Sequence, residues 1–160
     1  SGVRTDGICW LWGCNMYRGS YPPSWADTVT LYNQHRSDAD GRTKTVWLRT
    51  VLHGCFYGSQ KRQQLDGMTL ICVDTHLVRI RATENYKSPD EWHRLSLDQA
   101  PLYFTLGKGD VIVKGEVDDS IPDNRSASGI LSKYPDAFEV AEAKDNSGPG
   151  RFSAHYYGGD

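Results

Sequence analysis

A cysteine near the start of the chain has the setting of a nucleophile. Cys9 stands in the sequence DGICWL, residues 6–11, where it follows a glycine turn and takes the first position of a predicted helix. The unpaired backbone N–H groups and the positive end of the helix dipole at such a position stabilise a thiolate. Cys9 is therefore a candidate for attack on a carbonyl carbon. The alternative is that Cys9 is a small core residue beside Trp10.

Two histidines are candidates for the general base that such a thiol requires. His93 lies in the alternating segment WHRLSL, residues 92–97, and His76 starts the alternating segment HLVRIRA, residues 76–82. Either histidine would open a strand that could face the start of the helix. The spacing of the residues therefore leaves the choice between His93 and His76 open.

The elements that would position these side chains differ between the two halves of the chain. Residues 24–36 and 42–53 carry apolar side chains three and four positions apart, which predicts two helices. From Met68 onwards, apolar and polar side chains alternate, which predicts antiparallel strands in residues 69–73, 76–82, 92–97, 102–106 and 110–117. Residues 118–151 are rich in Asp, Ser, Gly and Pro, and we expect them to run over the surface. The prediction is one α+β domain over residues 1–160, with a helical half at about 8–55 packed on a sheet half at about 68–160.

The composition narrows the classes of function. The 160 residues include 18 Lys and Arg against 20 Asp and Glu, a formal net charge of −2, which argues against a strongly basic nucleic-acid binder. A local basic patch for RNA or a protein partner stays open through Lys61, Arg62, Arg79 and Arg81. No run of eighteen apolar residues predicts a membrane span. The four cysteines and five histidines lack the paired spacing of a metal site, so we expect neither a metal nor a cofactor.

Several motifs follow one another in the order found in a family of viral proteases. The sequence DGICWL resembles the Gly-x-Cys-Trp nucleophile motif of papain-like cysteine proteases, in particular the arterivirus replicase leader (nonstructural protein 1) autoproteases. Residues 31–36 and 42–48 resemble the helices that follow the nucleophile there, and Trp92-His93 resembles the Trp-His that supplies the base. The resemblance implies a minimal papain-like fold in which Cys9 and His93 form a catalytic dyad.

The end of the chain resembles the junction at which such proteases release themselves from a polyprotein. Tyr156, Tyr157, Gly158 and Gly159 match its Tyr-Gly-Gly pattern. The resemblance implies that this C-terminal segment binds in the active site and is cut there in cis. It also implies action against host innate-immunity proteins, in the host cytoplasm with the host nucleus as an alternative.

A hypothesis from another class stays open beside the protease. The same residues are compatible with a noncatalytic protein-binding or RNA-binding domain of a viral or host-interacting protein. Selective alkylation of Cys9 over the other three cysteines would favour the protease, because only a thiolate reacts quickly at neutral pH.

Overall fold

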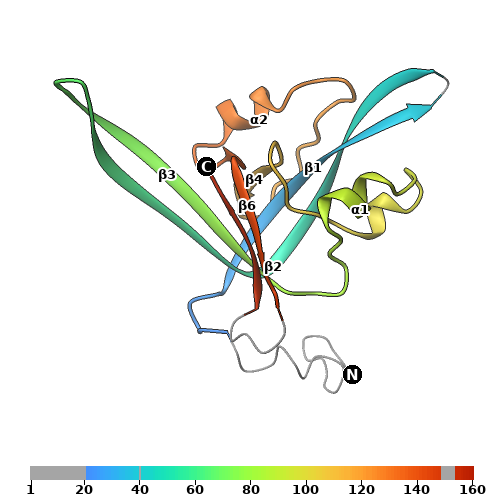
Figure 1. Cartoon of the computed structure of the whole chain (residues 1–160), viewed down its shortest axis with the longest axis horizontal. Helices are drawn as coiled ribbons and strands as arrows, with labels where there is room; N and C mark the ends of the chain where they lie inside the picture. Colours follow the sequence, from blue (N-terminus) through green and yellow to red (C-terminus); the bar gives the residue numbers. More distant parts are fainter. Residues whose placement is uncertain (1–20, 40, 149–153) are drawn as a thin grey trace.

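The computed structural model describes residues 21–39, 41–148 and 154–160, and strands dominate this part of the chain (Figure 1). The described strands form one antiparallel sheet in the order β5-β4-β1-β2-β3-β7-β6. Their bounds are β1 Asp27–Ala39, β2 Arg42–Asp66, β3 Thr69–Arg81, β4 Val111–Lys114, β5 Phe138–Glu139, β6 Glu142–Asn146 and β7 His155–Gly159. Two short helices, α1 (Pro89–His93) and α2 (Ser128–Lys133), and a 3₁₀ turn, η2 (Ala100–Leu102), lie in the connections.

Strand β2 is long enough to take part in two separate hairpins. Its residues 42–55 pair with β1, and its residues 56–66 pair with β3. Gly54, with φ +68°, lies where the pairing changes, and a glycine tolerates this left-handed conformation without a steric penalty. The two hairpins diverge from this point in Figure 1, so that each ends far from the other.

The main core lies between the two parts of the bent sheet. Its buried side chains come from six of the strands and from the segment after η2, and they include Val29, Leu31, Tyr57, Val78, Ile80, Phe104, Leu106, Ile112, Phe138, Val140 and Tyr156. A second cluster lies on the other face of β1 and β4, where Tyr32, Val111 and Val113 are covered by side chains from residues 117–130, namely Val117, Ile121, Ala127 and Ile130. Strands β1 and β4 are therefore buried on both faces.

The end strands of the sheet, β5 and β6, are consecutive in the chain. The N–H of Gly109 donates to the carbonyl of Val140 at 2.9 Å, and the N–H of Ala141 donates to the carbonyl of Gly159 at 2.8 Å. These bonds continue the ladders of β4 and β7 across the short link between β5 and β6. The sheet is therefore curved so strongly that its two end strands, β5 and β6, are linked directly by the chain.

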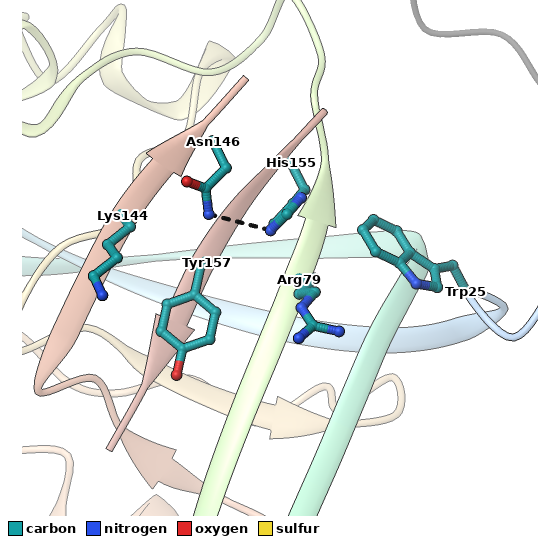
Figure 2. Close-up of a pocket in the computed structure, with 6 residues that line it drawn as sticks. All are labelled: Trp25, Arg79, Lys144, Asn146, His155 and Tyr157. Carbon is teal, nitrogen blue, oxygen red and sulfur yellow. Dashed lines mark hydrogen bonds between the residues drawn. The ribbon is translucent and has the colours of Figure 1, made fainter. Parts of the chain in front are cut away.

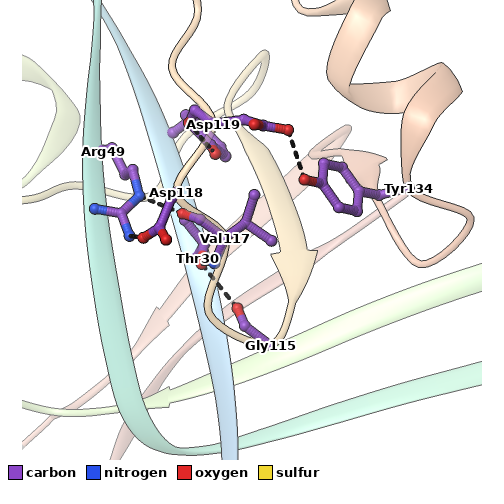
Figure 3. Close-up of polar contacts among 8 residues, drawn as sticks. Thr30, Arg49, Gly115, Val117, Asp118, Asp119 and Tyr134 are labelled. Carbon is purple, nitrogen blue, oxygen red and sulfur yellow. Dashed lines mark hydrogen bonds and ion pairs between the residues drawn. The ribbon is translucent and has the colours of Figure 1, made fainter.

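The connection from β4 to α2 is held against β1 and β2 by polar contacts (Figure 3). The hydroxyl of Thr30 donates to the carbonyl of Gly115 at 2.7 Å and accepts the N–H of Val117 at 3.0 Å. The guanidinium of Arg49 donates to the carbonyl of Val117 and forms an ion pair with Asp118 at 3.2 Å. Beyond these contacts, Ile121, Ala127 and Ile130 are buried in the second cluster, whereas we expected all of residues 118–151 to run over the surface.

The predicted α+β fold with an N-terminal helical half is wrong. Residues 27–39 and 42–53, most of which we expected in helices, lie in β1 and β2. Both segments are rich in β-branched residues, among them Thr28, Val29, Thr30, Val46 and Val51, which favour strands. Residues 29–33 of β1 are all buried, and a strand buried on both faces places apolar residues at many spacings, helical ones included. The described residues consequently lack the papain-like arrangement.

The predictions for the second half are partly confirmed. The strands predicted at residues 69–73 and 76–82 are confirmed as parts of the single strand β3, and residues 111–114 of the strand predicted at 110–117 form β4. The predicted strand at residues 102–106 is wrong, because Leu102 ends η2 and Phe104 forms only an isolated bridge. The predicted strand at residues 92–97 is wrong, because α1 occupies Pro89–His93. The side chain of Ser88 accepts the N–H of Glu91 at 3.4 Å, and Pro89 takes the first helical turn, so this is a capped helix start that the alternation concealed.

Candidate functional site

The described part of the chain holds only one member of the predicted dyad. Cys9 lies outside the described residues, so the pairing of Cys9 with His93 stays a prediction. His93 ends α1 and lies on the surface, with its ring 6.1 Å from the ring of His35 and 5.2 Å from that of Trp92. Partial burial, followed by electrostatic repulsion from the neighbouring His35 and Arg36 side chains, lowers the pKa of His93.

The alternative base, His76, is held by a carboxylate. Its Nδ1 lies 2.8 Å from Oδ2 of Asp160, and its backbone N–H donates to Oδ1 of the same residue at 2.6 Å. Its ring stacks on Phe138 with a centroid distance of 5.5 Å. This arrangement orients the imidazole, and it also fastens the residue that follows β7 to the edge of β3.

The predicted cleavage junction is an interior strand of the sheet. Tyr156, Tyr157, Gly158 and Gly159 belong to β7, which is hydrogen-bonded to β3 on one side and to β6 on the other. The ring of Tyr156 is buried and stacks on Tyr86 at a centroid distance of 3.6 Å. To enter an active site, this segment would have to leave both neighbouring strands.

The two glycines of this strand have a packing role. A Cβ on Gly158 would lie 3.1 Å from the side chain of Leu106, and a Cβ on Gly159 would lie 2.8 Å from the hydroxyl of Tyr157. Both distances are shorter than ordinary van der Waals contacts. The Gly-Gly pair therefore allows β7 to pack closely, which is a structural reason for the pattern that resembles a protease junction.

A shallow groove crosses the outer face of β3, β7 and β6 (Figure 2). Its volume is about 330 Å³, and it is lined by Trp25, Arg79, Lys144, Asn146, His155 and Tyr157. The amide of Asn146 lies 3.3 Å from Nε2 of His155, and the His155 ring meets Trp25 edge-on at 5.4 Å. The groove combines cations with aromatic rings and lacks a cysteine or serine among its lining residues, so its chemistry suits binding.

The predicted basic patch is divided by the fold. Arg79 lines the groove, but Arg81 is engaged within the protein, where its guanidinium donates to the carbonyl of Trp25 at 2.9 Å and lies over the ring of Tyr21 at 4.8 Å. Lys61 and Arg62 lie on the β2–β3 hairpin, with their side chains on opposite faces because they are neighbours in a strand. One of the four predicted cations therefore belongs to the groove.

The end of the β2–β3 hairpin forms a projecting arm, defined here as residues 59–76. Its two strands pair from Ser59 opposite His76 to Asp66 opposite Thr69, and the hairpin extends away from the body of the molecule in Figure 1. Every residue from 59 to 72 is exposed. Strand β7 pairs with β3 only over residues 77–81, so the arm has no third strand among the described residues.

The tip of the arm carries exposed apolar side chains on both faces. Leu65 (69% exposed) lies opposite Leu70 (57%), Ile71 (38%) points to the other face, and Met68 at the turn is fully exposed. Residues 70–73 (LICV) form an uninterrupted apolar run in β3. The short apolar run predicts this strand, but nothing in the pattern indicates that it projects from the core.

Over residues 21–39, 41–148 and 154–160, no group of three or more His, Cys, Asp or Glu side chains is placed to hold a metal ion. Among the helices of the same ranges, none has the length and apolar character needed to cross a membrane.

Comparison with known proteins assigns a family without an activity. Residues 25–157, which are most of the chain, match the model of a protein family described as a family of unknown function. No curated protein matches the chain, and no solved structure matches it. The surfaces of the molecule are therefore the basis for a functional proposal.

Proposed function

We propose that this chain, which belongs to DUF6751, a family of unknown function, has a noncatalytic role. It is a protein-binding domain that associates with a second copy of itself through the projecting arm. The observation that carries this proposal is the exposed apolar tip of the arm, with Leu65, Met68, Leu70 and Ile71 open to solvent. Such a cluster on a protruding element is typical of an association surface.

The arm also has too few strands to be more than marginally stable without a partner. A two-stranded ribbon is only marginally stable in water, and three or more strands are needed for independent stability. From residue 59 to residue 76 the arm spans eight residue pairs, or about 27 Å at roughly 3.4 Å per residue. Side-by-side pairing of two such arms would make four strands and cover the open edge of β3.

The open edge of β3 is suited to pair with itself. In an antiparallel arrangement with Cys72 on the two-fold axis, Ile71 of each copy lies opposite Val73 of the other. The only charged residue of segment 69–75 is Asp74, and in this register it lies opposite Leu70, so like charges do not meet. Edge strands that avoid association usually carry lysine, proline or a bulge, and segment 69–75 has neither lysine nor proline.

The arterivirus-type protease hypothesis has less support. It depended on a helical half in which the described residues 27–39 and 42–53 lie in strands instead. Its nucleophile, Cys9, lies outside the described residues, and Cys55 is no substitute, because burial raises the pKa of the Cys55 thiol to about 12.

Sedimentation velocity of the full chain over a wide range of protein concentration tests the proposal. We expect a monomer–dimer equilibrium that Ile71→Lys weakens by roughly tenfold or more, because the substitution removes an apolar contact twice per dimer and adds two charges. The control is Leu102→Lys, which changes another exposed apolar residue (68% exposed, against 38% for Ile71) that lies on η2, outside the arm. This control should leave the equilibrium unchanged.

Cross-linking tests the arrangement of the two arms. In a variant whose other cysteines, Cys9, Cys14 and Cys55, are serine, mild oxidation should produce a Cys72–Cys72 disulfide, because directly opposite residues in antiparallel strands have suitable Cα distances. A chain that stays monomeric at all concentrations would overturn the proposal. A dimer that is equally sensitive to both lysine substitutions would overturn the arm as its interface.

A further inference from the structure

Four side chains form a row across the outer face of the sheet, in which aromatic rings and cations alternate. Phe56 of β2 is the register partner of Arg79 of β3, Arg79 is the partner of Tyr157 of β7, and Tyr157 is the partner of Lys144 of β6. Because register partners lie on the same face, these four side chains stand side by side. Figure 2 shows the last three of them in line.

The cations of the row lie close to the rings. The guanidinium carbon of Arg79 is 5.2 Å from the centroid of Phe56, and the ammonium of Lys144 is 6.0 Å from the centroid of Tyr157. None of the four residues is buried, so each ring keeps surface that a ligand could cover. Strands are about 4.8 Å apart, and the row therefore spans about 14 Å.

A hollow lies on each side of the row, and Tyr157 lines both. The groove described above contains Arg79 and Lys144, with Trp25 at its far end. The second hollow, of about 310 Å³, extends from Phe56 and Tyr157 toward Arg62 at the base of the arm. Together they make a shallow track that runs over four strands and contains three cations.

Two carboxylates lie near these three cations. Among the residues that line the two hollows, Asp160 is the one carboxylate, and it is bonded to His76. Glu142, beside the track, forms an ion pair with Lys144 at 2.8 Å. Although the whole chain has a formal net charge of −2, the track itself is positive.

We infer that this track binds single-stranded nucleic acid. Unpaired bases would stack on the rings of Tyr157 and Phe56, and the phosphates between them would contact Arg79, Lys144 and Arg62. Aromatic rings on an open sheet face, interleaved with cations, are the combination by which proteins hold single strands without reading their sequence. A duplex offers no unstacked bases to these rings, so it is not the ligand.

Fluorescence anisotropy with labelled single-stranded oligothymidine and oligouridine tests the inference on the full chain. We expect saturable binding whose logarithmic salt dependence has a slope of about −2, since three phosphates are neutralised at roughly 0.7 each on a single strand. Arg79→Gln should weaken binding and reduce that slope by about 0.7. Tyr157→Leu should weaken binding by about five- to hundredfold, the range expected from the loss of one stacked base.

Matched variants separate the track from general charge and from misfolding. Arg36→Gln removes the same charge from β1, and Tyr103→Leu removes a ring elsewhere, and both should leave binding unchanged. Tyr157→Phe keeps the ring and should keep the affinity. Absence of binding at low salt, equal loss in the control variants, or stronger binding of a duplex of the same length would each overturn the inference. Full competition by polyglutamate would overturn it too, because a general acidic partner would then suffice.

Discussion

Asp110 is a buried carboxyl group that directly precedes β4, and it allows a test of how burial changes the pH dependence of stability. Its Oδ2 accepts the N–H of Gly107 and the amide of Asn33, each at 2.9 Å, and its Oδ1 accepts the N–H of Gln34 at 3.2 Å. Burial outweighs these hydrogen bonds and raises the pKa of Asp110 from 3.8 to about 6. The folded protein therefore binds a proton at Asp110 more tightly than the unfolded chain does.

The direction of the pH dependence follows from this difference. Between about pH 4 and pH 6 the unfolded chain has lost the proton while the folded protein retains it, so the contribution of Asp110 to stability decreases as pH rises. The contribution is fully present below the unfolded value of 3.8 and is lost once the pH passes the folded value of about 6. At about 1.4 kcal/mol for each unit of pKa, the change amounts to about 3 kcal/mol.

The substitution Asp110→Asn removes the titration while keeping the size of the side chain. Urea unfolding at pH 4, 5, 6 and 7 should show that the variant gains stability relative to the wild type as pH rises, by up to about 3 kcal/mol across the range. Asp66→Asn, at the exposed turn of the arm, is the control and should parallel the wild type. A constant difference between Asp110→Asn and the wild type would refute the argument that burial governs this carboxyl group.

Two further predictions concern the junction-like strand and the thiols. Gly158→Ala should lower the free energy of unfolding by about 1–3 kcal/mol in a urea titration, because the added methyl group would crowd Leu106 in the core. The control is Gly129→Ala in α2, where an added methyl group meets no atom within 4 Å and should be neutral or stabilising. Equal effects of the two substitutions would contradict the packing role of Gly158. In mass-spectrometric alkylation at neutral pH, exposed Cys72 should react and buried Cys55 should not. Alkylation of Cys9 much faster than that of Cys72 would support the protease hypothesis. Alkylation of Cys9 no faster than that of Cys72 would count against it.

The parts of the fold that could be predicted from the sequence are those where one face of a strand meets solvent. The alternation in HLVRIRA identifies the inner end of β3, because Val78 and Ile80 are buried while Arg79 and Arg81, which alternate with them, are less so. The same rule failed for β1, whose residues 29–33 are buried on both faces and show no alternation. Its β-branched content was the better signal, and it was outweighed by the chance helical spacing of Trp25, Val29 and Tyr32.

The candidate surfaces were less accessible to prediction, because they depend on strand register. Arg79 was singled out within a basic patch, but its alignment with Phe56, Tyr157 and Lys144 joins four segments that are distant in the chain. The resemblance assigns Tyr157 to a cleavage junction because the pair Gly158-Gly159 follows it. Nothing in the spacing of Gly158 and Gly159 distinguishes a flexible cut site from a strand that packs closely on Leu106.

The curled sheet constrains the order in which the chain can fold. The hairpins that share β2 are local, since each joins neighbouring strands through a short turn, and they can form early. The contacts that bring in β4 and the end of β7 are remote: Thr30 and Gly115 are 85 positions apart, and His76 and Asp160 are 84 positions apart. Closing such long loops costs entropy before any contact offsets it, so refolding should be slow, on the millisecond-to-second scale of β-rich domains. During that interval the exposed apolar arm forms before the core is complete. Partly folded, newly made chains would therefore associate through their arms before each has completed its own core.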